Sequence, residues 1–466
     1  MPGQISVHKN RASVSLKFIV VGGSIAGLAT AYTLRKAGHS VLIIEKSDGH
    51  SVCKGGLRSP PNMTRILNQW GLAPALAKMS HKCDTFTFHN GANGEPIGSV
   101  IMQETFLVHL LADFLFIEHS ELHYALHELA SEAGVKFMFQ ADVVDADSES
   151  VSVTLGNGEK LKADVIVGAD GYDSFMRGVV TGEYEGINPP PDTCGKRLWV
   201  TFSIPTAVLE GDEDLRPFAN PLVWTLFLGD GYILRGHLLA GGKEFSVSLV
   251  YTYNGPLKEG DEEWKSFSSL DQWDLDYSRF EPRPLKLLKS TNRFSARIVR
   301  VRPHLESLVC DEARIVLVGE AAHPLLPSGF HSTGLGLEDA LTLGNLFSRI
   351  TNRNQVSQLL TAYEEIRQPR VASVHAHEVQ QQAMLTVPAV AMHRRDDVMR
   401  KALAYEDWEH MDEATFKMVW GGVLDICTHD ASESVDDWWT QWGAYFEHTD
   451  RRGSVSIPST VQTSVA

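Results

Sequence analysis

Residues 18–27 read Phe-Ile-Val-Val-Gly-Gly-Ser-Ile-Ala-Gly, and this stretch decides the fold. The short apolar run passes into a glycine-rich turn, which is followed by an Ala- and Leu-rich segment, residues 28–36. A second apolar run, residues 41–44, ends in Glu45. Strand, glycine turn, helix, strand and acid in this order predict the opening βαβ unit of a dinucleotide-binding fold.

Each position in this unit has a physical role. Gly22 permits a tight turn, Gly27 lets the helix pack against the strand, and the free N–H groups of the helix N-terminus suit a pyrophosphate. Glu45 lies where a carboxylate accepts hydrogen bonds from a ribose. Ser24 stands where the fingerprint has its middle glycine, which weakens the match. The residues predicted to contact the nucleotide are Gly22, Ser24, Ala26, Gly27, Glu45 and Lys46.

Two more strands end in loops of nucleotide-binding character. Residues 151–167 predict a hairpin whose second strand runs directly into the loop 168–177, which contains Asp170 and Gly171. Residues 314–318 predict another buried strand, which opens into the loop 319–336. Because the three loops are far apart in the sequence, the cofactor domain is expected to be assembled from both halves of the chain.

The remaining segments predict an insertion and a helical end. About residues 194–293 alternate in hydrophobicity, which predicts a sheet with one covered face, and the chain after residue 336 is helical. The expected fold is therefore α/β, with a split Rossmann-like cofactor domain, an inserted β-rich substrate domain and a helical C-terminal region. The expected ranges are 17–185 with 294–380, then 186–293 with part of 80–105, then 381–452, flanked by loose tails at 1–16 and 453–466. Helices are expected at 337–350, 358–382, 396–405 and 413–419.

Composition limits the class of protein. The chain has 466 residues, 42 Lys and Arg against 58 Asp and Glu, and a formal charge of −16, so nucleic acid is not an expected partner. The five cysteines include no CxxC pair, which favours free thiols in a reducing compartment. No segment is long and apolar enough for a membrane span, and the N-terminus has no secretory pattern. These features predict a cytoplasmic enzyme.

The three motifs together resemble the FAD-dependent single-component aromatic hydroxylases, the salicylate hydroxylase and para-hydroxybenzoate hydroxylase group. The resemblance is carried by residues 21–28 (Val-Gly-Gly-Ser-Ile-Ala-Gly-Leu), 167–174 (Val-Gly-Ala-Asp-Gly-Tyr-Asp-Ser) and 318–327 (Val-Gly-Glu-Ala-Ala-His-Pro-Leu-Leu-Pro). It covers roughly residues 17–380 and is supported by residues 54–62 and 363–370. Carried over onto this chain, it adds further FAD contacts: Gly56, Arg58, His119, Asp170, Gly171, Glu320, Pro327 and Gly334.

The resemblance implies a flavoprotein monooxygenase. FAD would be reduced by NAD(P)H as co-substrate, and one oxygen atom of O₂ would pass through a flavin hydroperoxide to a phenolic or aromatic-acid substrate, with or without decarboxylation. The partner implied is a small aromatic molecule, and the protein is expected to be a monomer or homodimer. Two alternatives stay open: a flavin monooxygenase that tailors a natural product by epoxidation or dearomatisation, and a flavin-binding module without catalysis.

The chain departs from the family pattern at two cofactor positions. Glu320 stands where the third motif usually has Asp, so the carboxylate is one methylene longer. His119 stands where the family often has an arginine. Since an imidazole holds an anionic cofactor less firmly than a permanently charged guanidinium, we expect weakened FAD retention.

The substrate domain supplies the candidate catalytic residues. Ile233, Arg235 and His237 share one face of a predicted strand. Arg235 is expected to bind a carboxylate or phenolate oxygen and His237 to take the phenolic proton, unless both lie on a solvated outer face. His331, in the loop before the helix at 337–350, is the third catalytic candidate.

A metal site is not expected. His119, His123 and His127 recur at a spacing of four, which places them on one helix face, but no further ligand completes a site. The same spacing arises on any half-exposed amphipathic face.

Overall fold

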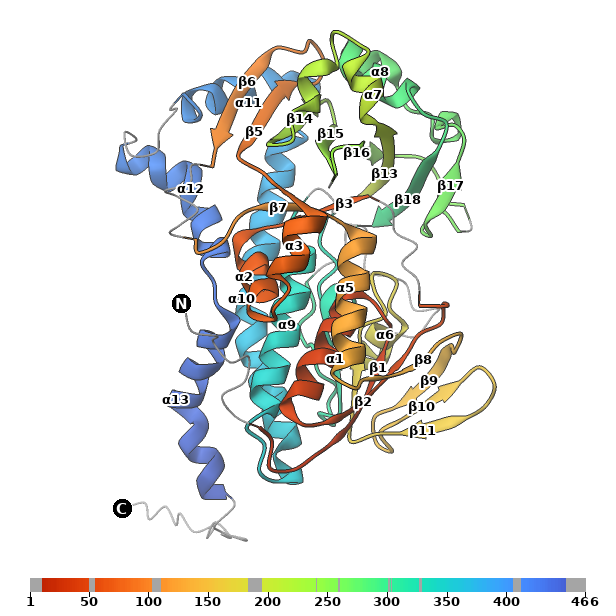
Figure 1. The fold of residues 1–466 in the computed structure, drawn as a ribbon, viewed down its shortest axis with the longest axis vertical. Helices are drawn as coiled ribbons and strands as arrows, with labels where there is room; N and C mark the ends of the chain where they lie inside the picture. Colours follow the sequence, from red (N-terminus) through yellow and green to blue (C-terminus); the bar gives the residue numbers. More distant parts are fainter. Residues whose placement is uncertain are drawn as a thin grey trace, which may run out of the picture.

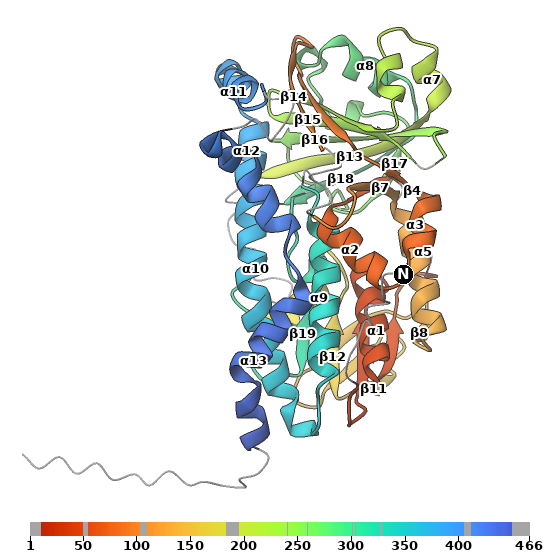
Figure 2. The same cartoon turned by 60° about the vertical axis from the view of Figure 1, so that its left-hand side comes forward.

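The computed structural model describes residues 11–49, 55–102, 110–182, 195–239, 241–258, 260–300, 302, 304–326, 329–404 and 412–449. The chain forms a lower α/β part and an upper β-rich part, and one long helix, α10 (Val356–Leu385), extends from the first to the second (Figures 1 and 2). Residue 327 lies outside the described residues, so the expectation for Pro327 has no structural counterpart.

The lower part is built on a five-stranded parallel sheet in the order β19-β12-β1-β2-β8. Its strands are β1 (Lys17–Val21), β2 (Ser40–Ile44), β8 (Lys136–Met138), β12 (Val165–Gly168) and β19 (Ile315–Leu317). They come from both halves of the sequence, as a split Rossmann-like domain requires. The carboxyl ends of β1, β12 and β19 are neighbours, so the three loops of the sequence motifs meet at one edge of the sheet.

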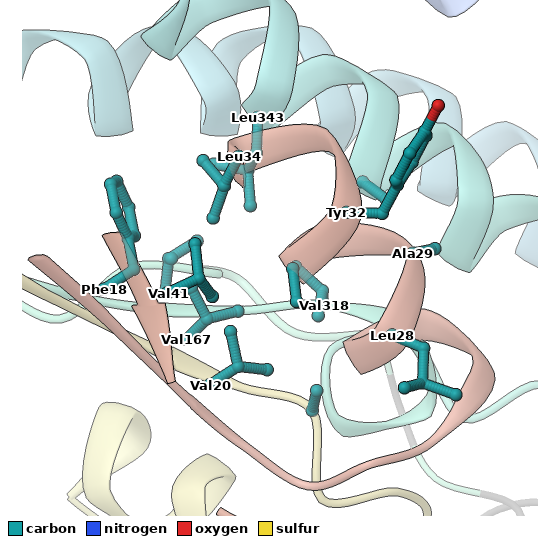
Figure 3. Packing of buried hydrophobic residues seen from close by; sticks show 14 of the residues in the cluster. Phe18, Val20, Leu28, Ala29, Tyr32, Leu34, Val41, Val167, Val318 and Leu343 are labelled. Carbon is teal, nitrogen blue, oxygen red and sulfur yellow. The ribbon is translucent and has the colours of Figure 1, made fainter. Parts of the chain in front are cut away.

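Apolar packing holds helix α1 (Ile25–Ala37) on this sheet. Phe18, Val20, Val41 and Val167 point from the strands toward Leu34, and all five side chains are at most 2% exposed (Figure 3). Helix α9 (Ser332–Phe347) packs against α1 on the same side. Gly344 makes this approach possible, because a Cβ there would lie 2.5 Å from Cβ of Thr33. The loops at the sheet edge therefore rest on a rigid base.

The upper part is an eight-stranded, mostly antiparallel sheet in the order β17-β18-β13-β16-β15-β14-β5-β6. Its strands are β5 (Thr85–Asn90), β6 (Pro96–Ile101), β13 (Lys196–Pro205), β14 (Val223–Gly229), β15 (Tyr232–Leu238), β16 (Glu244–Tyr253), β17 (Lys265–Phe267) and β18 (Phe294–Arg300). One face carries a large apolar cluster that includes Tyr232, Leu234 and Leu238, and alternate residues of β15 face the other way.

Two boundaries differ from the sequence expectation. The sequence assigns residues 294–300 to the cofactor domain, but β18 pairs with β13 and β17 of the upper sheet. A short apolar strand carries no mark of the sheet it joins. The sequence predicts one strand over residues 161–167. In the structure, β11 (Lys160–Lys162) forms a small sheet with β10 (Ser152–Leu155) and β9 (Val143–Asp147), and β12 is a separate strand that begins at Val165.

A second three-stranded sheet lies between the two parts (Figure 1). Strand β7 (Leu115–Glu118) pairs with β3 (Gly56–Ser59) and β4 (Ser80–Lys82). The remaining shorter helices before α9 are α2 (Pro61–Gln69), α3 (Ala73–Met79), α5 (His119–Glu132), α6 (Phe175–Thr181), α7 (Thr206–Glu210) and α8 (Pro282–Lys289), of which α7 and α8 lie between strands of the upper sheet.

The C-terminal region is helical, as expected, with different bounds. Its helices are α11 (Ala389–Ala402), α12 (Glu413–Cys427) and α13 (Ala431–Thr449). The sequence places the start of α11 seven residues too late and gives α13 no helix of its own. Helix α11 contacts β6, whereas α13 packs on α9 and α10 (Figure 2). Within the described ranges, no helix has the length and apolarity to cross a membrane.

Candidate active site

The loop after β1 has no room for a side chain at either of two glycines of the fingerprint, Gly22 and Gly27. A Cβ on Gly22 would lie 2.4 Å from the carbonyl oxygen of Ala169, and Gly22 has a φ of +106°. A Cβ on Gly27 would lie 2.1 Å from the carbonyl oxygen of Gly22. Backbone therefore meets backbone here, which leaves the N-terminus of α1 open to a ligand.

Ser24 has a definite role where the fingerprint has a glycine. Its hydroxyl donates to the carbonyl oxygen of Ala169 at 2.9 Å and accepts the Gly27 N–H at 3.2 Å. Ser24 is thus the N-cap of α1 and also ties the first loop to the loop after β12. A serine in place of the middle glycine therefore stabilises the contact between these two loops.

Glu45 turns back onto the glycine loop. One carboxylate oxygen accepts the Gly23 N–H at 2.7 Å and the other accepts the Ser47 N–H at 2.8 Å. Although burial opposes it, these two amides hold the pKa of Glu45 below its usual value. The neighbouring Lys46 is exposed. Glu45 is therefore a fixed carboxylate with lone pairs left for ribose hydroxyls.

The side chain of Asp170 serves its own loop. It accepts the Ser174 hydroxyl at 2.5 Å and the Met176 N–H at 3.0 Å, at the start of α6. Burial raises its pKa. Gly171 has a φ of +85° and its Cβ position is open. Asp170 therefore shapes the loop, and Gly171 supplies the turn.

Arg177 joins the second and third loops. Its guanidinium donates to the carbonyl oxygen of Ala321 from Nε and to that of Glu320 from Nη2, each at 2.9 Å. The Glu320 side chain is exposed and accepts the Ser332 hydroxyl at 3.1 Å. The longer carboxylate thus reaches the first turn of α9.

The N-terminus of α9 approaches α1 through small residues. A Cβ on Gly319 would lie 2.5 Å from Cβ of Ala26, and one on Gly336 would lie 3.0 Å from the same atom. Gly334 is less constrained, since its nearest neighbour would be Met63 at 3.5 Å. The amide dipoles of α9 therefore point toward the edge where the three loops meet.

His119 and His123 lie at the start of α5, beside the first loop. Nε2 of His123 lies 2.8 Å from the carbonyl oxygen of Gly23, to which it donates. Burial, followed by the proximity of His123, lowers the pKa of His119 to about 4. His119 is therefore neutral, and weaker FAD retention stays a prediction. Across the described ranges, no group of three His, Cys, Asp or Glu residues is arranged to hold a metal ion.

A second group of polar residues lies between the two parts of the molecule. Arg235 on β15 is 3% exposed, so the alternative of a solvated outer face is wrong. Arg58 on β3 is partly buried, and Cζ of Arg58 and of Arg235 lie 5.8 and 5.7 Å from the ring centroid of Trp224. Burial lowers the pKa of Arg58 to about 10 and also lowers the pKa of Arg235 well below its usual value.

His237 lies on the same face of β15 and is 4% exposed. Its ring stacks on Phe116 at a centroid distance of 3.9 Å, and Nδ1 lies 3.1 Å from the carbonyl oxygen of Leu238. Gly56 fits against this ring because a Cβ there would lie 2.1 Å from Cε1 of His237. Burial lowers the pKa of His237 to about 3, so the imidazole is neutral and a weak base.

The predicted candidate His331 and two residues that no motif marks, Phe330 and Glu378, complete this group. Phe330 lies 6.3 Å from Trp224 and 5.6 Å from Phe114 by ring centroids. Glu378, on α10, accepts the backbone N–H groups of Phe330 and His331 at 3.1 Å each. The name "arginine cluster" is used below for Arg58, Trp224, Arg235, His237, Phe330, His331 and Glu378.

Several buried polar atoms of the arginine cluster have no hydrogen-bond partner. They are Nε of Arg58, Nε1 of Trp224, both ring nitrogens of His331 and Oε2 of Glu378. Burial lowers the pKa of His331 to about 3 and raises that of Glu378 to about 7. Since buried polar groups normally find partners, this concentration indicates a place for a polar ligand.

A buried ion network fixes α9 and α10 beneath this cluster. Arg367 donates to Glu338 at 2.9 Å and to Asp339 at 2.7 Å, and Arg370 donates to both oxygens of Glu338. His323 lies 2.6 Å from Asp339. These charges are mutually satisfied, so the network is a scaffold for the start of α9.

The residues present fit FAD. The cradle at Gly22 and Gly27, the fixed Glu45 carboxylate and the open α1 N-terminus suit an adenosine pyrophosphate. The start of α9 offers amide dipoles to an electron-rich ring edge, and the arginine cluster lies directly beside it through His331.

Comparison with known proteins agrees with this geometry. Residues 15–191 match the family model described as an FAD binding domain. Hispidin-3-hydroxylase of Neonothopanus nambi is 28% identical over 383 residues, covering 79% of this chain and 89% of the relative. The 3-hydroxybenzoate 6-hydroxylase of Klebsiella oxytoca is 27% identical over 363 residues, covering 77% and 86%. A salicylate hydroxylase substrate complex superposes with a TM-score of 0.70 at 18% identity, covering 91% of this chain and 97% of that one. The expectations of a Rossmann-like FAD-binding domain and of the hydroxylase resemblance are confirmed.

Proposed function

We propose that the chain is an FAD-dependent monooxygenase of the aromatic hydroxylase type and that it adds one oxygen atom of O₂ to the ring of an acidic aromatic substrate. By acidic we mean a phenol or an aromatic acid. One observation carries the proposal: Arg58 and Arg235 lie over the ring of Trp224 in the interior, where burial disfavours their charge. Such cations suit the binding of an anion.

We propose that FAD is held by the three loops. The proposed contacts are Gly22, Ser24, Ala26, Gly27, Glu45, Lys46, Gly56, His119, Asp170, Gly171, Glu320 and Gly334. Bound FAD, reduced by NAD(P)H, supplies the activation of O₂ and the transfer of one oxygen atom. We assign Arg58 to the binding of the substrate, because its guanidinium donates to the carbonyl oxygen of Gly329 and lies over the ring of Trp224.

The proposed roles of the arginine cluster follow from its chemistry. Trp224 and Phe330 offer an aromatic wall to the substrate ring and exclude water, while Arg58 and Arg235 hold its carboxylate or phenolate. A phenolate is the stronger ring nucleophile, so two cations that favour it lower the cost of oxygen transfer. Nδ1 of His237 donates to the carbonyl oxygen of Leu238, which leaves Nε2 to accept a substrate hydroxyl. His331 offers a second neutral imidazole at the start of α9.

The relatives support an acidic substrate. The substrate in the name of 3-hydroxybenzoate 6-hydroxylase carries both a carboxylate and a phenol, and a salicylate hydroxylase shares the fold. Loss of CO₂ would accompany the reaction if the attacked carbon bears the carboxylate.

The test is NAD(P)H consumption by the FAD-loaded protein in air, with and without hydroxybenzoates, salicylate and hispidin. Stimulated consumption together with a product that contains one oxygen atom from ¹⁸O₂ supports the proposal. A yellow protein that consumes no NAD(P)H with any of these compounds contradicts it and favours a flavin-binding module.

A further inference from the structure

Glu378 has one oxygen fixed and the other without a partner. Oε1 accepts two backbone N–H groups, from Phe330 and His331, and the residue is 5% exposed. Oε2 is buried without a hydrogen-bond partner. It lies so close to Gly329 that a Cβ there would be 1.5 Å away. The carboxylate is therefore held in one orientation, with a free acceptor in the interior.

Two cations from other elements face this carboxylate. The charges of Arg58, on β3, and Arg235, on β15, both act on Glu378. Arg58 also donates to the carbonyl oxygen of Gly329 at 2.6 Å, so cation and carboxylate hold the same loop. The arginine cluster thus contains two positive charges against one carboxylate.

The other titratable groups near Glu378 leave this balance unchanged. Burial keeps His237 and His331 neutral, each with a pKa of about 3. Burial also lowers the pKa of His377, the neighbour of Glu378 on α10. The nearby carboxylate of Glu338 is paired with Arg367 and Arg370.

We propose that Glu378 and an anionic group of the substrate alternate as the counter-ion of Arg58 and Arg235, so that a proton moves onto Glu378 as the anion binds. When the substrate arrives as a neutral phenol, its O–H bond breaks and an O–H bond forms at Oε2 of Glu378, with no change in oxidation state. When it arrives as a carboxylate, the proton comes from the buffer acid in solution, whose conjugate base remains there. This inference rests on the proposed function, and it makes Glu378 the proton acceptor in place of the weakly basic His237.

The physical reason is charge balance in a buried site. A second anion beside Glu378 shares the same two cations, so keeping both carboxylates ionised costs more than protonating one of them. Burial already raises the pKa of Glu378 to about 7, so the proton is taken up and released near neutral pH. The substrate class that follows is an aromatic acid, a phenol or an enol, with one negative charge in the bound state.

The experiment measures proton uptake when benzoate binds to the oxidised, FAD-loaded protein, by calorimetry in two buffers of different ionisation enthalpy. At pH 8 we expect the wild type to take up about one proton, and benzoate affinity to fall about tenfold per pH unit above pH 8. At pH 5.5, where Glu378 is already protonated, uptake should vanish. Glu378→Gln should bind benzoate at pH 8 with no uptake and about tenfold more tightly than the wild type.

Glu365→Gln is the matched control, because Glu365 is an exposed glutamate on the same helix. It should show wild-type uptake. Binding to the wild type without uptake at pH 8, or equal uptake by Glu378→Gln, overturns the proposal, and the wild-type result decides the matter if Glu378→Gln does not fold. Either result leaves the proposed function standing if phenols still stimulate NAD(P)H consumption. Failure of benzoate to bind overturns the proposed substrate class together with this proposal.

Discussion

The loop edge of the five-stranded sheet and the arginine cluster are both polar, yet they are organised in opposite ways. At the loop edge, Ser24 and Arg177 bind backbone groups of the neighbouring loops, and Asp170 accepts a backbone N–H from the end of its own loop. In the arginine cluster, Oε2 of Glu378 and both nitrogens of His331 are buried without partners. In the first region, these polar side chains already have protein partners, so this scaffold suits recognition of a cofactor by the shape of its backbone. The second region contains buried polar atoms without hydrogen-bond partners, and such atoms can gain partners when a polar ligand binds.

The largest expected effect comes from disturbing the scaffold. Gly22→Ala places a Cβ 2.4 Å from a backbone oxygen at a φ of +106°, so we expect at least ~3 kcal/mol of destabilisation and loss of FAD. Gly158→Ala is the control, because Gly158 has a φ of +85° with nothing near its Cβ position. It should cost about 1–2 kcal/mol and keep FAD. Thermal melts and the flavin-to-protein ratio measure both, and normal FAD content in Gly22→Ala would contradict the scaffold description.

The next effect comes from the arginine cluster. Arg235→Met leaves Glu378 with Arg58 alone, which removes the excess positive charge that binds an anion. We expect kcat/KM for a hydroxybenzoate to fall by a factor of about 100 to 1,000, corresponding to about 3–4 kcal/mol, with FAD content unchanged.

Arg216→Met is the control for this variant, since Arg216 is exposed in the same part of the molecule. It should leave kcat/KM within about twofold of the wild type. Equal activity of Arg235→Met and Arg216→Met would show that the buried cation does not serve the substrate.

The smallest expected effect tests whether the loop edge also recognises FAD through the charge of Glu45. Glu45→Gln keeps an acceptor but loses the charge that the Gly23 and Ser47 amides stabilise, so we expect FAD to bind about tenfold more weakly. Lys46→Gln changes the exposed neighbour and should alter FAD affinity less than about threefold. Fluorescence titration of the apoprotein with FAD measures both. Equal losses of FAD affinity in the two variants would contradict a specific role for Glu45.

The sequence predicts the scaffold better than the arginine cluster. Glycines and an acid at fixed spacing identify the first loop, because the constraints are local in the chain. The capping role of Ser24 emerges only in the structure. The alternation along β15 correctly places Arg235 and His237 on one face.

The remaining site residues carry no such mark. Glu378 lies within a long helix, and only the packing of α10 brings it to Phe330 and His331. The resemblance assigns Arg58 to FAD because it lies within the family-like segment 54–62, and the tertiary fold puts its guanidinium over the ring of Trp224. Contacts between domains leave no periodic trace in the sequence, so burial and charge become visible only in three dimensions.

The central claim is that an acidic aromatic substrate binds with its anion between Arg58 and Arg235 and its ring against Trp224 and Phe330. A crystal structure of the FAD-loaded protein with 3-hydroxybenzoate tests it most directly. We expect one of the ligand's acidic groups, carboxylate or hydroxyl, within hydrogen-bond distance of both guanidinium groups, and the ring beside the flavin. A ligand bound elsewhere, or one whose acidic groups both avoid the two arginines, would contradict the claim.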